Sequence, residues 1–260
     1  MLYDNGVQTM LGVLGGMGPM ATVDFMRKLV EATPATCDQD HLQTLVCAAT
    51  RIPDRTAAIL RHGPAPLPAM ILALRRLEAA GATRIAIPCN TAHHWHPALQ
   101  AATDLPILHI VDAVTAALAR KRIHSGLVGL LATDGTIRAG VYQSHLPDGL
   151  VCRMPENQSA VMRAISLVKA GRTAEAKSIL RAQADALLAS GCRQVVLACT
   201  EIPLAFEGFT DLRPHLLDAT EALAQACVAA CVEGPVPPEG AAWGAATMKT
   251  ARRLESAIPV

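Results

Sequence analysis

Two of the eight cysteines occupy corresponding places, each at the end of an apolar run and before polar residues. Cys89 follows "RIAIP" and precedes Asn-Thr, and Cys199 follows "QVVLA" and precedes Thr-Glu. Ligands of α/β proteins bind at the carboxyl ends of parallel strands, and a helix that begins there favours the thiolate form of a cysteine. Two such thiols facing one cleft could take a proton from one face of a carbon and give one to the other face. The pattern predicts acid–base chemistry that inverts a carbon centre.

The other cysteines lack this context, and a lone cysteine in an apolar stretch is usually a small core residue. The first ten residues lack the positive start and apolar stretch of a secretory signal, and no apolar run has the length of a membrane span. We therefore expect a cytoplasmic protein with reduced thiols. Core positions without disulfides are expected for Cys37, Cys47, Cys152, Cys192, Cys227 and Cys231.

A metal site is an alternative role for the segment after Cys89. Cys89, His93, His94 and His96 are close in sequence, and a Cys-x3-His spacing can put two ligands on one face of a helix. The segment after Cys199 has no histidine, however, and the proline after His96 indicates a surface turn. We therefore expect no metal at this site, and surface positions for His94 and His96.

The glycine-rich loop that begins at Gly16 has two interpretations. Gly16-Met-Gly18-Pro-Met-Ala21 fits a loose G-x-G-x-x-A pattern, which is typical of dinucleotide binding. That interpretation needs an acidic residue at the end of the second strand, but Asp40 precedes that strand, which ends in "AAT". A tight turn whose backbone N–H groups bind a small anion, such as a carboxylate, is the simpler interpretation.

The composition restricts the classes of partner. The formal net charge is +1 and no basic run is present, so the chain has no field that would attract nucleic acid or an anionic membrane. Hydrophobic residues make up 51% of the chain and aromatic residues only 3%, which predicts an aliphatic core of helices packed on a parallel sheet. The expected partner is a small molecule, with no nucleic acid and no membrane.

Short apolar runs alternate with amphipathic segments along the chain. The helical segments 67–82 and 173–191 each have a glycine at the last or the next-to-last position, and glycine commonly stops a helix. The apolar runs predict strands that are buried on both faces of a parallel sheet, as in an α/β fold. These runs are 11–16, 42–50, 84–89, 105–110, 126–133, 149–154, 194–200 and 214–219.

The chain also contains an internal duplication. "GVLGGMGPMATVDF" from Gly12 resembles "GLLATDGTIRAGVY" from Gly129, and "AAGATRIAIPCNT" resembles "LASGCRQVVLACTE". Each half has a cysteine at a strand end, so we predict two similar α/β domains that face one another. The first would comprise residues 1–112 plus about 216–232 with Cys89, and the second residues 113–215 with Cys199. The Gly-, Pro- and Ala-rich segment 233–260 is expected to be a weakly ordered extension.

Six segments occur in an order that makes the chain similar to the cofactor-independent aspartate/glutamate racemase family: "GVLGGMGPMAT", "IPDRTA", "PCNTAH", "LLATDGTI", "VKAG" and "ACTE". The similarity runs from about Leu11 to Cys231. "PCNT" and "CTE" are typical of the superfamily, and "IPDRTA" points to its aspartate branch. The resemblance implies two pseudo-symmetric Rossmann-like domains, each a mostly parallel sheet flanked by helices, with the active site between them. It also implies no pyridoxal phosphate, no metal and a homodimer.

The resemblance implies roles for individual residues. Cys89 and Cys199 would be the two acid–base thiols. Arg55 of "IPDRTA" and Lys169 of "VKAG" stand where the family binds substrate carboxylates, and arginine suits planar two-point binding of a carboxylate. Arg51, in "AATR" where relatives often have Asn and Pro, is expected to add a positive charge nearby. The other positions expected to line the substrate are Met17, Asn90, Thr91, Ala92, Thr133, Thr136, Thr200 and Glu201.

These observations predict a racemase that interconverts L- and D-aspartate by proton transfer between two thiols at the α-carbon, within D-amino-acid metabolism. The α-proton beside a carboxylate is a very weak acid, so the site must stabilise the developing negative charge and exclude water. The alternatives are a glutamate or broad-specificity amino-acid racemase, or a relative of hydantoin racemases, maleate isomerases or decarboxylases. A non-catalytic small-ligand binder is a further alternative, although binding alone requires neither thiol.

Overall fold

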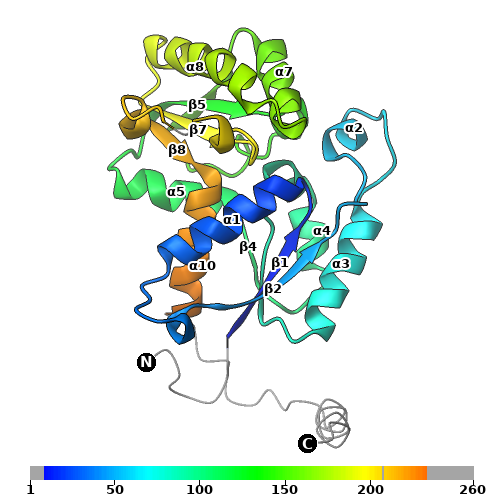
Figure 1. Cartoon of the computed structure of the whole chain (residues 1–260). Coiled ribbons are helices and arrows are strands. Elements are labelled where there is room, and N and C mark those ends of the chain that lie inside the picture. The colour runs from blue at the N-terminus through cyan, green and yellow to red at the C-terminus, as the bar shows by residue number, and fades with distance from the viewer. Residues whose placement is uncertain (1–8, 207, 233–260) are drawn as a thin grey trace, which may run out of the picture.

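The structure, a computed structural model, describes residues 9–206 and 208–232 of the 260-residue chain (Figure 1). Its strands form two separate four-stranded sheets, and every strand pair in both sheets is parallel. The first sheet has the order β2-β1-β3-β4. Its strands are β1 (Met10–Gly15), β2 (Gln43–Ala48), β3 (Arg84–Ala86) and β4 (Ile107–Leu108).

The second sheet repeats the topology of the first. Its order is β6-β5-β7-β8, so in both sheets the second, first, third and fourth strands of the half lie side by side. The strands are β5 (Gly126–Ala132), β6 (Leu150–Arg153), β7 (Gln194–Ala198) and β8 (Leu216–Asp218). The eight apolar runs of the sequence therefore all contain strands, and the predicted α/β fold with two parallel sheets is confirmed. The central strands β1 and β7 are buried almost throughout, as their continuous apolar sequences require.

Helices flank both sheets in the described part of the chain. Those of the first half are α1 (Pro19–Ala32), α2 (Arg55–Ile59), α3 (Leu67–Ala79), α4 (His96–Gln100) and α5 (Ile110–Arg120). Those of the second half are α6 (Asp134–Arg138), α7 (Gln158–Lys169), α8 (Thr173–Ala189), α9 (Pro203–Phe206) and α10 (Ala219–Val232). Short 3-10 helices occur at η1 (Asp38–Asp40), η2 (Asn90–Trp95) and η3 (Arg213–His215). No helix in the described residues is long and apolar enough to cross a membrane.

The outer helices confirm the two amphipathic segments of the sequence. α3 packs Met70, Leu74 and Leu77 against the first sheet, and α8 packs Leu180 and Leu187 against the second. Each helix ends just before a glycine in the left-handed region, with φ of 95° at position 81 and 91° at position 191. A glycine in this conformation ends a helix without the steric cost of a side chain.

The inner helices α1, α5 and α10 lie between the two sheets (Figure 1). One cluster of buried apolar side chains includes Leu11 and Val13 from β1, Val128 and Leu130 from β5, and Leu223 from α10. The two halves therefore share a continuous aliphatic core. β8 pairs with β7, so the strand at the predicted boundary near residue 216 belongs to the second sheet. The division into residues 1–112 plus 216–232 and 113–215 stays a prediction, and the extension predicted for 233–260 lies outside the described residues.

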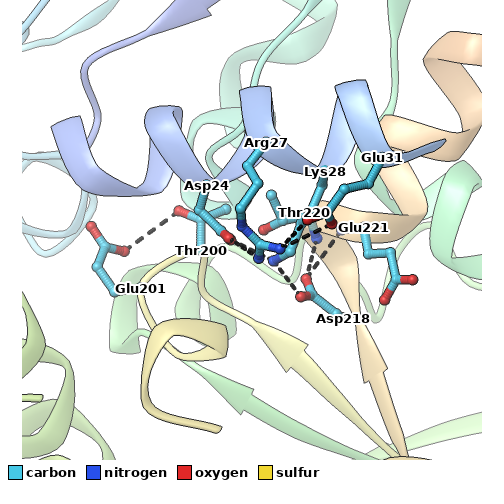
Figure 2. Close-up of polar contacts among 9 residues, drawn as sticks. All are labelled: Asp24, Arg27, Lys28, Glu31, Thr200, Glu201, Asp218, Thr220 and Glu221. Atoms are coloured by element: carbon cyan, nitrogen blue, oxygen red, sulfur yellow. Dashed lines mark hydrogen bonds and ion pairs between the residues drawn. The ribbon is translucent and has the colours of Figure 1, made fainter. Parts of the chain in front are cut away.

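A buried ion-pair network also joins α1 to the second sheet (Figure 2). Lys28 contacts the carboxylate of Asp24 on its own helix and lies 2.5 Å from that of Asp218 at the end of β8. Arg27 binds Asp24 at 2.7 Å from the exposed side of α1. Burial lowers the pKa of Lys28, but Asp218 and Asp24 outweigh burial, so the pKa is raised above its ordinary value. The charged lysine thus bridges two carboxylates that come from different halves of the molecule.

Candidate active site

The two predicted thiols lie at equivalent strand ends of the two sheets. Cys89 follows β3 and precedes η2, and Cys199 directly follows β7. Each strand is the third of its half and lies beside the first, so the two cysteines are related by the internal duplication. Their side chains are buried, with exposed fractions of 5% and 4%. The first sheet and the second thus each supply one thiol to the region where the halves meet.

Both thiols line the same cavity, which has a volume of about 20 Å³. A cavity of this size holds about one water molecule, so the site is narrow in this structure. Its walls come from both halves, and they are formed by Met17, Asp54, Arg55, Thr56, Cys89, Asn90, Thr91, Thr133, Lys169, Cys199, Thr200 and Glu201.

Most of the sequence-predicted site residues are in this lining. There are two exceptions. Thr136 does not line the cavity but forms a hydrogen bond with Thr91, which does, and Ala92 is fully buried in the core of the first half. Arg51 is exposed and is not among the lining residues, and the positive charge that it was expected to add near the site stays a prediction. Asp54 and Thr56 line the cavity but were missed, although they flank Arg55 in the "IPDRTA" motif that singled it out.

Buried hydroxyl groups connect the two halves beside the thiols. The Thr91 hydroxyl, from the first half, lies 2.9 Å from that of Thr133 and 2.8 Å from that of Thr136 in the second half. The Tyr142 hydroxyl donates a 2.6 Å hydrogen bond to Asn90 Oδ1. Burial raises the pKa of Tyr142 well above its ordinary value, so the phenol stays a donor. No sequence pattern singled out Tyr142, because its partner is distant in the chain.

The environment of Cys199 is not the one that the sequence predicted. Its thiol donates a hydrogen bond of 3.1 Å to Oε2 of the buried Glu201. Burial raises the pKa of Cys199 well above its ordinary value, the Glu201 carboxylate raises it further, and Lys169 opposes this effect. The expectation that a following helix would favour the thiolate is therefore wrong for Cys199: α9 begins only at Pro203, and desolvation and the adjacent carboxylate raise the pKa of the thiol. The residue two positions after Cys89 is Thr91, so the first half has no carboxylate at the equivalent place.

Three buried polar atoms of the lining have no hydrogen-bond partner among the described residues. They are Arg55 Nε, Asn90 Nδ2 and Glu201 Oε1. An unpaired buried polar atom costs about 1–3 kcal/mol, so a ligand that pairs with these atoms would recover this free energy. Two of the atoms are donors and one is an acceptor, and the Lys169 ammonium adds positive charge to the same cavity.

The glycine-rich loop after β1 passes directly beside this site. Gly16 has φ of 86°, and a Cβ there would lie 2.5 Å from the backbone nitrogen of Ala49. A Cβ on Gly18 would lie 2.8 Å from Glu201 Oε1. Glycine is thus required for the close approach of the loop to β2 and to the buried carboxylate. Met17, from the same loop, forms part of the cavity wall.

Cys89 and the histidines that follow it do not converge on a common point. His93 Nε2 lies 3.1 Å from the Ile87 carbonyl oxygen, and His96 Nε2 lies 2.9 Å from that of Ile107. Burial and the neighbouring imidazoles lower the pKa of His93 well below its ordinary value, so its ring is neutral. His94 is exposed, as predicted, whereas His96 is half-buried. Among the other cysteines, Cys37 is exposed, so its predicted core position is wrong.

Comparison with known proteins gives consistent results. The sequence profile of the family described as Asp/Glu/Hydantoin racemase matches residues 14–227. The broad-specificity amino-acid racemase RacX of Bacillus subtilis is 26% identical over 230 residues, which are 84% of this chain and 96% of that protein. A glutamate racemase of Deinococcus radiodurans is 34% identical over 139 residues, which are 50% of this chain and 46% of that protein. Among solved structures, the Picrophilus torridus aspartate racemase superposes with a TM-score of 0.76 at 30% identity, covering 88% of this chain and 96% of that one.

Proposed function

The chain belongs to the Asp/Glu/hydantoin racemase family, and from this premise we propose that it interconverts L- and D-aspartate by proton transfer between Cys89 and Cys199. The observation that carries the proposal is the shared cavity: one buried thiol from each half reaches it from an equivalent strand end. An internally duplicated protein suits a reaction whose substrate and product are mirror images. The predicted homodimer and cytoplasmic location belong to the same proposal.

In one direction the thiolate of Cys89 removes the α-proton, and the thiol of Cys199 gives its proton to the opposite face of the α-carbon. In the other direction the roles are exchanged. One S–H bond forms, one breaks, and no electrons are gained or lost, so the chemistry requires no redox group. The hydrogen bond from Cys199 to Glu201 supports the role of Cys199 as the proton donor of the first direction.

The polar atoms of the lining suit a dicarboxylic amino acid. The Arg55 guanidinium and Lys169 ammonium would bind carboxylates, and Arg55 Nη1 is oriented by the carbonyl oxygens of Ile52 and Pro53 at 3.2 and 3.0 Å. Asn90 Nδ2 would donate to the α-carboxylate, where charge grows as the proton leaves. The unpaired Glu201 Oε1 would accept a hydrogen bond from the substrate ammonium. The likeness to the Picrophilus torridus aspartate racemase, which extends over 88% of this chain, supports aspartate as the substrate.

A broad-specificity amino-acid racemase is the second candidate. It is supported by the likeness to RacX over nearly the full length of that protein. Lys169 is exposed and lies at the end of α7. Its long, flexible side chain could therefore reach the carboxylates of substrates whose side chains differ in length.

Incubation in D2O tests the proposed reaction. The protein, freed of metal and pyridoxal phosphate, is incubated with L-aspartate, and we expect D-aspartate that carries deuterium at the α-carbon. Chirality is followed by chiral chromatography and deuterium by mass spectrometry, with L-glutamate and a neutral amino acid in parallel. Turnover of all three substrates at similar rates would favour the broad-specificity candidate. Absence of α-deuterium in every amino acid tested would overturn the racemase assignment of this chain.

The Glu201→Gln variant is expected to lower kcat by about 10- to 100-fold and to shift the pH profile. Glutamine preserves the size of the side chain but removes the negative charge that raises the pKa of Cys199. The pKa of Cys199 then falls. In the direction that uses Cys199 as the proton donor, kcat therefore begins to decrease at a lower pH than in the wild type. The measurement is kcat against pH from each enantiomer. Glu156→Gln, an exposed position, serves as the control. A lower kcat with an unchanged profile would mean that Glu201 only shapes the cavity.

A further inference from the structure

Four histidines form a continuous cluster of rings outside the lining of the cavity. The ring centroids of His93 and His96 each lie 4.7 Å from that of His109, and the His109 and His145 rings are stacked at 3.9 Å. None of these rings lines the cavity that contains the two thiols. The racemase reaction therefore does not use this imidazole cluster, and no step of the proposed mechanism explains it.

The outer end of the cluster brings together three metal-ligating side chains from different parts of the fold. His109 is the residue before α5, Asp112 lies in the first turn of that helix, and His145 lies in the segment between α6 and β6 of the second half. One ligand atom from each residue lies within 4.8 Å of the others. The His145 Nε2 and Asp112 Oδ1 atoms are already 2.7 Å apart.

We propose that His109, Asp112 and His145 form a binding site for one divalent transition-metal ion of the zinc type. Two imidazole nitrogens and one carboxylate oxygen suit Zn²⁺ and its first-row neighbours, whereas Ca²⁺ and Mg²⁺ require shells of oxygen ligands. The Asp112 and His145 side chains are 68% and 38% exposed, so solvent can supply the fourth ligand.

The side chains of the site must rearrange locally to accept the ion. Ligand atoms about 2.1 Å from a tetrahedral zinc lie about 3.4 Å from one another. The three ligand atoms now lie within 4.8 Å of one another, and the His145–Asp112 pair, at 2.7 Å, must move apart to reach this spacing. The exposed His145 ring must turn out of its stack with His109. The His109 Nδ1 atom accepts a hydrogen bond of 3.2 Å from the Val111 N–H, which coordination through that nitrogen would replace. His93 and His96 pack against His109 and hold its ring at the site.

The ion would also connect the two halves of the molecule. His109 and Asp112 follow the last strand of the first sheet, whereas His145 follows the first helix of the second half. The site is separate from the thiol cavity, so the proposal does not depend on the proposed substrate. Metal binding is expected to stabilise the protein in the same way whether the chain acts on aspartate or on another amino acid.

Calorimetric addition of Zn²⁺ to the metal-free full chain tests the site, and we expect one tight ion per chain. The His145→Ala and Asp112→Asn variants are expected to bind at least about 100-fold more weakly. Both side chains are at the surface, so these variants should fold. The His124→Ala variant removes an exposed imidazole outside the cluster and should bind as the wild type does.

Co²⁺ identifies the ligands independently. We expect the visible bands of four-coordinate cobalt without the near-ultraviolet charge-transfer band that a thiolate ligand produces. Such a band, lost in the Cys89→Ala or Cys199→Ala variant, would place the ion at the thiols and overturn the proposal. The proposal would also be overturned if the wild type and the His145→Ala variant bound Zn²⁺ with equal affinity. Weak binding of many ions per chain, as at an ordinary protein surface, would overturn it as well.

Discussion

Replacement of either Cys89 or Cys199 with alanine is expected to reduce aspartate racemisation by at least about 1,000-fold, within the range of acid–base catalysis by a positioned side chain. Inversion requires a group that removes the proton and a group that delivers one on the opposite face, and each thiol is the group of its own half. The double variant is expected to be no worse than either single variant, because the two thiols act as a unit.

The measurement combines enantiomer conversion with α-deuterium exchange in D2O for each variant. The thiol that remains can reach only one face, so any residual exchange should be confined to one enantiomer, and to opposite enantiomers in the two variants. Cys192→Ala is the matched control, since Cys192 is also a buried cysteine of the second half but does not line the cavity. Retention of more than about a tenth of the activity by either site variant would contradict the two-thiol mechanism.

Lys28→Met is expected to lower the free energy of unfolding by about 3–5 kcal/mol, the typical cost of removing one partner from a buried ion pair. The side chains of Lys28, Asp24 and Asp218 are 8%, 4% and 14% exposed. The variant leaves Asp218 Oδ2 without its cation in a desolvated position between the halves. Urea unfolding at neutral pH measures the loss.

Arg27→Met is the matched control because Arg27 binds the same Asp24 but is 49% exposed, and we expect a loss below about 1 kcal/mol. The stabilisation by Lys28 depends on pH in a defined direction. Its folded pKa is raised, so its contribution is fully present below its unfolded pKa and is lost as the pH rises through the folded value. Addition of Asp24→Asn and Asp218→Asn to Lys28→Met should restore part of the stability. Equal effects of Lys28→Met and Arg27→Met would contradict the importance of burial.

The strands and the thiols could be predicted from the sequence because both depend on local patterns. A strand buried on both faces is a continuous apolar run, and Cys89 and Cys199 stand at the ends of two such runs. The duplication then predicted two sheets of equal topology. Contacts between distant segments left no such pattern, as for the hydrogen bond from Tyr142 to Asn90, which spans 52 positions.

The sequence placed Glu201 in the site but did not predict its hydrogen-bond partner, because that contact also depends on the fold. The "CTE" motif includes Glu201, yet only the fold buries its carboxylate beside the Cys199 thiol. The sequence also did not predict the shared core of α1, α5 and α10, because the apolar residues of a helix do not specify which sheet the helix covers.

The difference between the two thiol environments has a consequence for the kinetics of a racemase. Enantiomers have equal free energy in an achiral solvent, so their equilibrium constant is one, and the Haldane relationship requires the same kcat/KM for both. Glu201 beside Cys199, with Thr91 in the equivalent place after Cys89, therefore cannot make the enzyme more efficient in one direction. The asymmetry of the halves is thus confined to saturating substrate, where kcat and KM differ between the enantiomers in the same proportion.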